Sequence, residues 1–277
     1  MRPGDIADAL GSRLVSSTVL AGGFSHETLL LTLTDGKVVA RLGGGDPVVE
    51  AAVMEAARVV VPVPAVLMVS PMVIEFVDGV TLNHAFSRNI GREVGRAVAR
   101  IAEVGFDRPG FFVDGSLTVK AEERPWSEQL AEVAAGVRPG RLDPETVRRW
   151  VRLCEEHAPA LREVDDHARL VHADINPKNI LIAQDRVAAI LDWEFSYSGC
   201  PYGDIANMAR HGADYPPDFL AGFYEGAEIS EKSRYVGRVL DMFALSDLMN
   251  RPAGNTAADR AADVIRDWVK HGVPDAG

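Results

Sequence analysis

Residues 170–206 read LVHADINPKNILIAQDRVAAILDWEFSYSGCPYGDIA, and this stretch decides the fold. It contains His172, Asp174 and Asn179 in the pattern HxDxxxxN. Asp174 and Asn179 alone would each more often be part of an ordinary turn. The complete pattern, followed by two strand-like segments and a further aspartate, is much less frequent by chance. We therefore interpret these residues as a functional loop rather than as turn residues.

The segments after this loop predict a β-hairpin. Residues 180–182 and 187–191 are apolar and are separated by a polar turn. Asn179 directly precedes the first segment and Asp192 directly follows the second, so the hairpin brings both residues to the same end. An amide oxygen and a carboxylate that converge there suit Mg²⁺, which prefers hard oxygen ligands. The alternative for Asp192 is a helix cap.

Asp174 lies on the loop that leads into this predicted metal site. A carboxylate there can accept a proton from a hydroxyl group that is held beside a metal-bound phosphate. Phosphoryl transfer needs these two parts, because the metal neutralises the phosphates and the carboxylate orients the nucleophile. The stretch therefore predicts an O-phosphotransferase that depends on magnesium and on ATP, with GTP as the alternative nucleotide.

HADINPKNIL followed by ILDWE resembles the aminoglycoside phosphotransferase family, which is related to the choline kinases. HxDxxxxN also resembles the catalytic loop of protein kinases. The resemblance extends over about residues 20–249 and implies an α+β, two-lobed, protein-kinase-like fold. A small lobe with an antiparallel sheet and one helix would comprise residues 1–77 and bind the nucleotide. A larger helical lobe, residues 78–277, would carry the catalytic and substrate-binding groups.

The same resemblance implies roles for individual residues. Asp174 would be the catalytic base, and Asn179 and Asp192 would be the magnesium ligands. His172 would support the loop without a catalytic role. Asp204 matches an aspartate that begins the next helix in the family, and we expect it to cap that helix and also brace the loop.

A kinase-like first lobe requires a phosphate-covering loop and a cation. Gly22, Gly23 and Ser25 lie between the predicted strands 15–20 and 28–34, where a glycine-containing loop would approach the phosphates. Arg41 ends the third predicted strand and stands where protein kinases have a lysine. Arginine can also bind a phosphate in a bidentate manner.

Two further contacts are expected in this lobe. Glu50, early in a predicted helix over residues 47–58, would orient Arg41, with Glu55 as the rival. The segment MVIEFVDG resembles the hinge of the family, in which the carbonyl of Glu75 and the amide of Val77 would pair with the nucleotide base. The remaining chain has helical periodicity over residues 82–104, 126–137, 144–164, 205–210, 217–224, 231–249 and 257–270.

Composition and charge disfavour some classes of binding partner. The chain has 277 residues and a net charge of −11, which disfavours a broad nucleic-acid-binding surface. The longest apolar run, residues 59–69, contains two prolines and is too short to span a bilayer. The two cysteines, Cys154 and Cys200, predict reduced thiols rather than a disulfide scaffold. We expect a cytoplasmic protein that is a monomer or homodimer, without nucleic-acid or membrane partners.

The acceptor alcohol is less well defined by the sequence. The family resemblance and the acidic helices after residue 204 favour a cationic antibiotic, either an aminoglycoside or a cationic peptide, whose phosphorylation would confer resistance. Asp214 and Asp218 are the first candidates for its binding because they lie in a proline-containing loop. The alternatives are a metabolic kinase for choline, homoserine or a sugar, and a non-catalytic pseudokinase. The aromatic candidates for a choline-type site are Phe219, Phe223, Tyr224, Tyr235 and Phe243.

Overall fold

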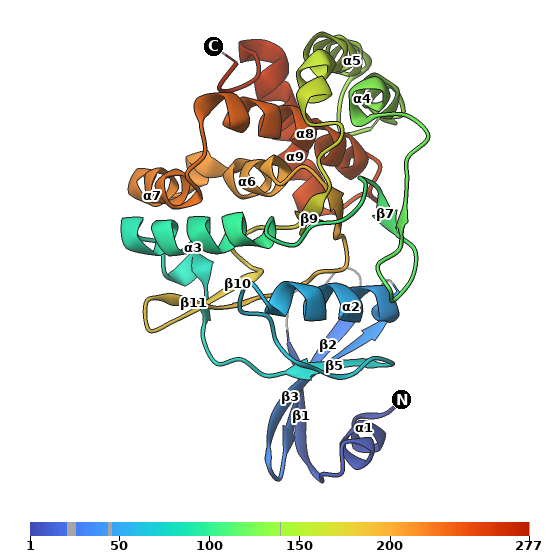
Figure 1. Cartoon of the computed structure of the whole chain (residues 1–277), viewed down its shortest axis with the longest axis vertical. Coiled ribbons are helices and arrows are strands. Elements are labelled where there is room, and N and C mark those ends of the chain that lie inside the picture. The colour runs from blue at the N-terminus through green and yellow to red at the C-terminus, as the bar shows by residue number, and fades with distance from the viewer. Residues whose placement is uncertain (21–25, 44–45, 139, 277) are drawn as a thin grey trace.

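The computed structural model of the chain describes residues 1–20, 26–43, 46–138 and 140–276. The chain folds into a strand-rich N-terminal lobe and a larger helical lobe (Figure 1), which confirms the predicted α+β class. The predicted boundary between residues 77 and 78 falls in the connection from the first lobe to the second. Among the described residues, no helix combines the length and apolarity that crossing a membrane requires.

Five strands in the described part of the N-terminal lobe form one antiparallel sheet. Their order is β1-β2-β3-β5-β4, so the chain runs through a meander and then adds β5 and β4 beside β3. A two-residue turn joins β2 to β3, because Leu33 pairs with Gly36. The bounds are β1 (Leu14–Leu20), β2 (His26–Leu33), β3 (Gly36–Gly43), β4 (Val66–Met68) and β5 (Met72–Glu75).

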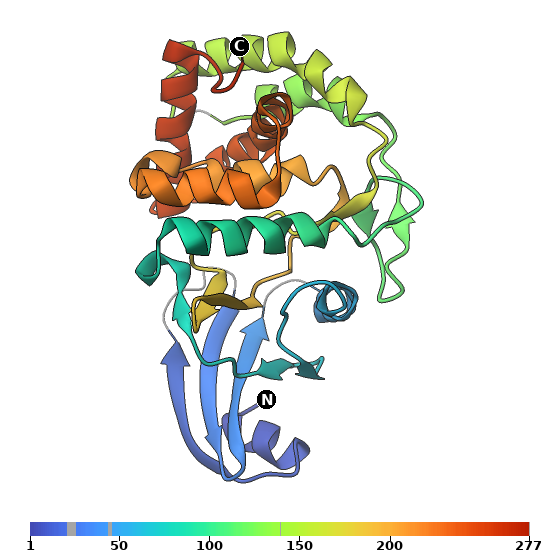
Figure 2. The ribbon, with the colours of Figure 1, turned by 60° about the vertical axis from the view of Figure 1, so that its left-hand side comes forward.

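Helix α2 (Pro47–Arg58) lies between this sheet and the helical lobe, as Figure 2 also shows. Asp46 caps the helix by accepting a hydrogen bond of 2.9 Å from the Val48 N–H, and Pro47 occupies the first helical position. The lobe also contains α1 (Pro3–Ala9), which the sequence analysis did not predict. Ile6 of α1 is fully buried against the sheet residues Leu31 and Ala40.

The helical lobe contains most of the remaining chain. Two predicted helices are shorter than expected: residues 82–104 divide into the 3₁₀ turn η1 and α3, and residues 144–164 divide into α5 and η2. The bounds are η1 (Leu82–His84), α3 (Arg88–Ile101), α4 (Trp126–Ala135), α5 (Pro144–His157), η2 (Ala158–Glu163), α6 (Tyr202–Ala209), η3 (Gly212–Asp214), α7 (Pro217–Ala227), α8 (Glu231–Met249) and α9 (Thr256–His271).

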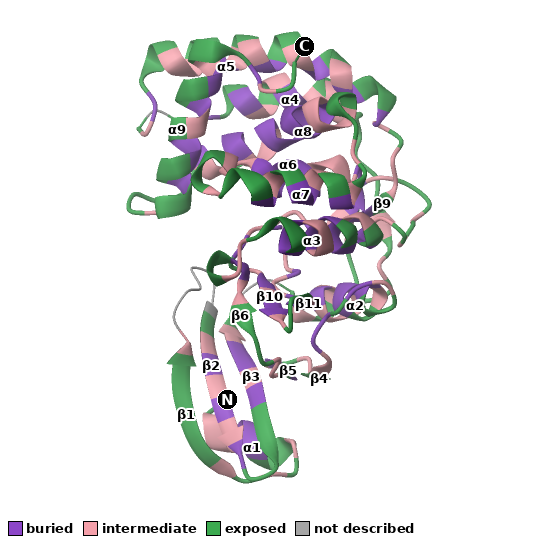
Figure 3. Ribbon diagram, turned by 90° about the vertical axis from the view of Figure 1, so that its left-hand side faces the viewer, coloured by how far each residue is buried: buried purple, intermediate pink, exposed green. Residues whose placement is uncertain are grey.

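Helices α3 and α7 pack unusually closely, and Figure 3 shows them side by side with buried faces between them. Each helix presents two glycines four residues apart to the other. A Cβ atom at any of these positions would lie 2.1–2.3 Å from a backbone oxygen of the facing helix. Only glycine therefore permits this approach. The four residues are Gly91, Gly95, Gly222 and Gly226.

Short strands connect the helices at the border between the lobes. β10 (Ile180–Ala183) and β11 (Arg186–Ile190) form the predicted hairpin, and β6 (Val80–Thr81) adds to its edge. β9 (Arg169–Val171) pairs with β12 (Tyr197–Gly199). A further pair consists of β7 (Phe111–Phe112) and β8 (Val119–Lys120).

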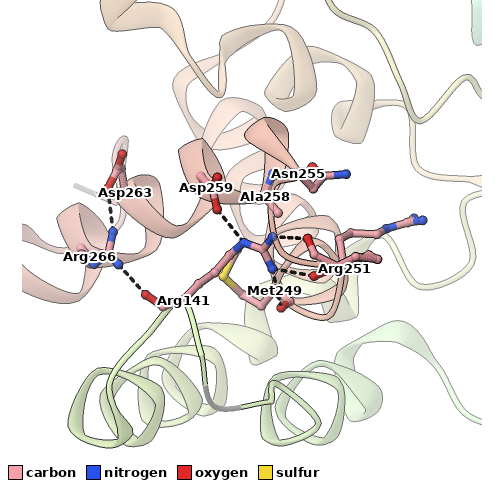
Figure 4. A network of polar contacts seen from close by, with 9 residues as sticks. Arg141, Met249, Arg251, Asn255, Ala258, Asp259, Asp263 and Arg266 are labelled. Atoms are coloured by element: carbon pink, nitrogen blue, oxygen red, sulfur yellow. Dashed lines mark hydrogen bonds and ion pairs between the residues drawn. The ribbon is translucent and has the colours of Figure 1, made fainter. Parts of the chain in front are cut away.

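A network around Arg141 holds the far end of the helical lobe together (Figure 4). The Arg141 guanidinium forms an ion pair of 2.8 Å with Asp259 and donates to the carbonyl oxygens of Arg251 and Pro252 at 2.6 and 2.5 Å. Arg266 of α9 donates to the Arg141 carbonyl at 2.5 Å. The connection from α4 to α5 is thereby tied to the connection from α8 to α9.

Candidate active site

The loop after β9 is organised by His172, whose ring is fully buried. Its Nδ1 accepts a hydrogen bond of 3.1 Å from the Asp174 N–H, and its Nε2 lies 2.9 Å from the Leu191 carbonyl. Burial lowers the pKa of His172 to about 4, so the ring is neutral and its Nε2–H donates to Leu191. Ala173 between these residues has a positive φ of 66°, which turns the chain sharply. His172 thus links the loop to the end of the hairpin.

Asp204 of α6 holds the same loop through hydrogen bonds to its backbone. Its carboxylate accepts hydrogen bonds from the backbone N–H groups of His172 and Ala173 at 2.9 and 2.8 Å. The expectation that Asp204 braces the loop is therefore confirmed. The expectation that it caps its helix is wrong, because α6 begins at Tyr202 and Asp204 lies inside its first turn. Burial raises the pKa of Asp204 to about 7, although both backbone hydrogen bonds favour its charged form.

Asp174 is held by two asparagines. Its Oδ1 accepts a hydrogen bond of 3.1 Å from Asn176 Nδ2, and its Oδ2 accepts one of 2.7 Å from Asn179 Nδ2. Burial, followed by the nearby negative charge of Asp192, raises the pKa of Asp174 to about 6. The sequence analysis gave no role to Asn176, although its position two residues after Asp174 in the same loop was a usable signal.

The hairpin brings Asn179 and Asp192 to the same end. Ile180 pairs with Ile190, and the Leu191 N–H donates to the Asn179 carbonyl at 2.8 Å, so Asp192 is the next residue along. Asn179 donates hydrogen bonds to Asp174 through its Nδ2. Its side-chain oxygen Oδ1 is the atom that can coordinate a cation. The amide oxygen and the Asp192 carboxylate are the hard ligands that Mg²⁺ prefers.

These two side chains would fill part of a magnesium coordination sphere. The described residues contain no group of three or more histidine, cysteine, aspartate or glutamate side chains arranged to hold a metal. Mg²⁺ commonly binds through one or two protein groups together with phosphates and water. Asn179 and Asp192 therefore fit a magnesium ion that arrives with a nucleotide rather than a permanent, protein-enclosed metal.

Arg41 connects the two lobes at this point. It lies on β3, forms a buried ion pair with Glu50 of α2, and forms a second ion pair of 3.0 Å with Asp192. Burial raises the pKa of Glu50, while the Arg41 charge opposes that shift. The rival Glu55 is exposed and pairs at 3.7 Å with Arg58 of its own helix. The structure thus brings Glu50, and not Glu55, to Arg41.

The structure describes only some of the other residues that were predicted to contact the nucleotide. Gly22, Gly23 and Ser25 lie outside the described residues. Glu75 is the last residue of β5, and Val77 lies in the connection to β6. Their backbone groups are therefore at the junction of the lobes, and their pairing with a nucleotide base stays a prediction.

A cavity of about 550 Å³ opens beside Asp174. This volume lies within the range of about 300–1,000 Å³ that is usual for small-molecule sites. Its walls come from the two small strand pairs and from α4, α6 and α8. The lining residues include Phe111, Glu122, Trp126, Ala173, Asp174, Phe195, Tyr197, Asn207, Arg210, Asp241, Phe243, Asp247 and Arg251.

The two predicted substrate carboxylates are not among the residues that line this cavity. Asp214 lies in η3 and forms an ion pair with Arg260, and Asp218 is exposed at the start of α7. Two other acidic residues of the same region, Asp241 and Asp247, do line the cavity. Of the five aromatic candidates for a choline-type site, Phe243 alone belongs to the lining, while Phe219 and Phe223 are buried in the core.

These lobes, the loop and the adjacent cavity define a protein-kinase-like phosphotransferase. The chain belongs to the phosphotransferase enzyme family abbreviated APH, whose model matches residues 16–237. It is therefore a phosphotransferase with a hydroxyl group as the acceptor. No curated protein matches the chain well enough to count as a relative.

Solved structures support the same fold. A thermostable mutant of aminoglycoside phosphotransferase APH(4)-Ia, bound to ADP and hygromycin B, has a TM-score of 0.74 and 16% identity, covering 99% of this chain and 98% of that one. Spectinomycin phosphotransferase APH(9)-Ia with ADP and spectinomycin has a TM-score of 0.65 and 13% identity, covering 95% and 93%. A putative fructosamine-3-kinase from Thermobifida fusca has a TM-score of 0.64 and 17% identity, covering 95% and 99%.

Proposed function

We propose that the protein transfers the γ-phosphoryl group of ATP to a hydroxyl group of a small molecule, with Mg²⁺ as cofactor. The observation that carries this proposal is one continuous set of contacts. The Asn179 side chain donates a hydrogen bond of 2.7 Å to the Asp174 carboxylate. The backbone carbonyl of Asn179 accepts a hydrogen bond from the N–H of Leu191, the residue before Asp192. Asp192 in turn pairs with Arg41 at 3.0 Å. This connected set of contacts supports a site in which Asp174 acts as the base, Asn179 and Asp192 as oxygen ligands, and Arg41 as the phosphate-binding cation.

Each group has a distinct task in this proposal. Asp174 orients the acceptor hydroxyl and takes its proton, and the neutral His172 keeps Asp174 in place through the backbone. Asn179 Oδ1 and the Asp192 carboxylate would hold the metal. Mg²⁺, when bound, neutralises negative charge on the phosphates. Arg41 would contact the phosphates, with Glu50 fixing the direction of its guanidinium.

The nucleotide contacts of the first lobe complete the proposal. Gly22, Gly23 and Ser25 would cover the phosphates, and the backbone of Glu75 and Val77 would pair with the base. Structural neighbours that contain ADP or AMP-PNP support a nucleotide site in this fold. ATP is the first candidate, and GTP is the alternative that a competition titration separates from it.

The acceptor belongs to one of two classes. A cationic antibiotic is supported by neighbours that contain hygromycin B or spectinomycin and by acidic side chains in the cavity. A metabolic alcohol is supported by the ion pairs that already neutralise Asp241 and Asp247. Since Glu122 and Asp174 are then the lining carboxylates without an arginine partner in the cavity, we place a small alcohol of low charge ahead of a polycation. A pseudokinase is disfavoured because Asp174, Asn179 and Asp192 are all present.

Calorimetric titration with ATP tests the metal site. The wild-type protein should bind ATP more tightly with magnesium than with EDTA. Asp192→Ala should lose at least about tenfold of this magnesium-dependent gain, the cost typical of even an outer-shell metal partner. Asn179→Ala should lose a smaller part, because one neutral ligand is removed.

Glu55→Ala serves as the matched control, since Glu55 is an exposed carboxylate of α2 that pairs with Arg58. It should retain the wild-type magnesium dependence. An equal magnesium effect in wild type, Asp192→Ala and Asn179→Ala would show that these residues do not bind the metal.

A further inference from the structure

The cavity beside Asp174 has a continuous aromatic wall. The rings of Phe111, Trp126 and Tyr197 contact one another with centroid distances of 5.7–5.9 Å, and Phe243 contacts Trp126 at 5.7 Å. These residues come from β7, α4, β12 and α8, so the wall is assembled by the tertiary fold. Phe111 remains 48% exposed. A ligand that covers these rings would remove apolar surface from water, which is favourable in proportion to the area buried.

A polar strip lies on α6 and α8. Arg210 and Asp241 form a two-point ion pair at 2.8 and 2.5 Å, and the Asp241 side chain is 2% exposed. Asn207, one helical turn before Arg210, also lines the cavity and is 8% exposed. Its Oδ1 is buried and has no hydrogen-bond partner among the described residues.

An orphaned amide oxygen at a cavity wall points to a ligand. A buried acceptor without a partner is destabilising, so a structure rarely retains one without a reason. The terminal torsion of asparagine is broad, so rotation of the side-chain amide can present Oδ1 to the cavity. An N–H or O–H group on the substrate would then complete the hydrogen bonding of Asn207.

The charges of the cavity limit the substrate further. Asp241 is held by Arg210, and Asp247 pairs with Arg251 at 3.0 Å. Of the cavity carboxylates, Glu122 and Asp174 are therefore the ones that no arginine of the cavity pairs with directly. Asp174 is the proposed base. A molecule with several ammonium groups would find few free carboxylates here.

We infer that the acceptor is an amphipathic alcohol that carries at most one positive charge. Its apolar body lies against the aromatic wall of Phe111, Trp126, Tyr197 and Phe243, and an N–H or O–H donor near the reacting hydroxyl binds Asn207. This inference rests on the proposed phosphotransferase function and names the substrate class of the same site.

A matched pair of probe alcohols tests the aromatic wall. Phenylalaninol and alaninol share one hydroxyl and one amino group and differ by the phenyl ring. With MgATP at saturation, kcat/KM should be at least about tenfold higher for phenylalaninol, as burial of a ring against apolar surface predicts. Trp126→Ala should remove most of this ratio and Trp126→Phe should restore part of it, while the KM for ATP stays unchanged.

A second variant tests the polar strip. Asn207→Leu keeps the branching and the number of heavy atoms of the side chain and removes the orphaned amide, so the melting temperature should stay the same or rise. The KM for phenylalaninol should increase about fivefold, as the loss of one hydrogen bond predicts. Asn89→Leu, at an exposed position of α3, is the control and should leave this KM unchanged.

The outcomes separate this inference from the proposed function. Turnover of hygromycin B with a higher kcat/KM than that of phenylalaninol would overturn the inference and keep the phosphotransferase. An unchanged KM in Asn207→Leu, equal kcat/KM for the two amino alcohols, or binding of MgATP without turnover of either would also overturn the inference. Failure to bind MgATP at all would instead remove the proposed function.

Discussion

As the proposed general base, Asp174 has to satisfy two conditions, since such a group must be ionised and must still attract a proton. Burial and Asp192 raise its pKa to about 6, whereas hydrogen bonds from Asn179 and Asn176 and the charge of Arg210 oppose the shift. The balance leaves Asp174 as a carboxylate at neutral pH with more affinity for a proton than an exposed aspartate has.

This balance predicts a pH profile. Because the carboxylate is the active form, kcat/KM should be constant above a pKa of about 6 and should fall about tenfold per pH unit below it. Asn176→Ala removes a hydrogen bond that favours the charged form, so the pKa of Asp174 should rise and the acid limb should move to higher pH. Steady-state rates from pH 5 to pH 9 measure both curves.

Asn89→Ala is the control for this prediction, because Asn89 is exposed on α3 and should leave the acid limb in place. A limb that moves to lower pH in Asn176→Ala, or a profile without an acid limb, would contradict the role given to Asp174.

Some residues of the site could be predicted from the sequence and others could not. The base and the two ligand candidates lie within one short stretch, and their spacing reveals a hairpin that brings them together. The pairing of Arg41 with Glu50 followed from a strand and the first turn of the next helix. Asn207 and Trp126 gave no such signal, because separate elements of the helical lobe bring them to the cavity. From the sequence, Asp214 and Asp218 were the first candidates for substrate binding, but in the fold they do not line the cavity.

At the scale of elements, the close pairing of α3 and α7 supports the helical lobe. Periodicity predicted a helix in spite of Gly91 and Gly95, but it could not explain these glycines. The reason is visible only when α7 is in place, since Gly222 and Gly226 face them. Helix ends were also difficult to predict, because the first turn of one expected helix and the last turns of another form separate 3₁₀ segments.

Gly95→Ala tests this packing. The new Cβ would lie 2.1 Å from the Phe223 carbonyl oxygen, so the helices would have to separate. We expect a loss of about 1–3 kcal/mol in the free energy of unfolding, the usual cost of overpacking. Gly4→Ala is the matched control, because nothing lies within 4 Å of its Cβ position and α1 should be unaffected or slightly stabilised. Urea denaturation of both variants provides the measurement, and equal stabilities would contradict the packing account.

At the scale of the whole molecule, the proposed active site takes its residues from both lobes. The first lobe supplies Arg41 and Glu50, and the helical lobe supplies Asp174, Asn179 and Asp192. The ion pair between Arg41 and Asp192 joins residues 151 positions apart in the sequence. The residues that line the cavity all belong to the second lobe and include Asp174, but neither Arg41 nor Asp192. If this cavity binds the acceptor as proposed, substrate choice can vary without a change in the residues proposed for the nucleotide.

The most direct test of the central claim is phosphorus NMR of the protein with ATP, magnesium and the acceptor panel of phenylalaninol, alaninol, choline, homoserine and hygromycin B. The wild-type protein should produce ADP and a phosphomonoester of at least one alcohol in equal amounts. Asp174→Asn should slow this reaction by about 10²–10⁴-fold while the melting temperature and ATP affinity persist, because only the proton acceptor is lost. Wild-type turnover in Asp174→Asn, or ADP formation without any phosphomonoester, would contradict the account.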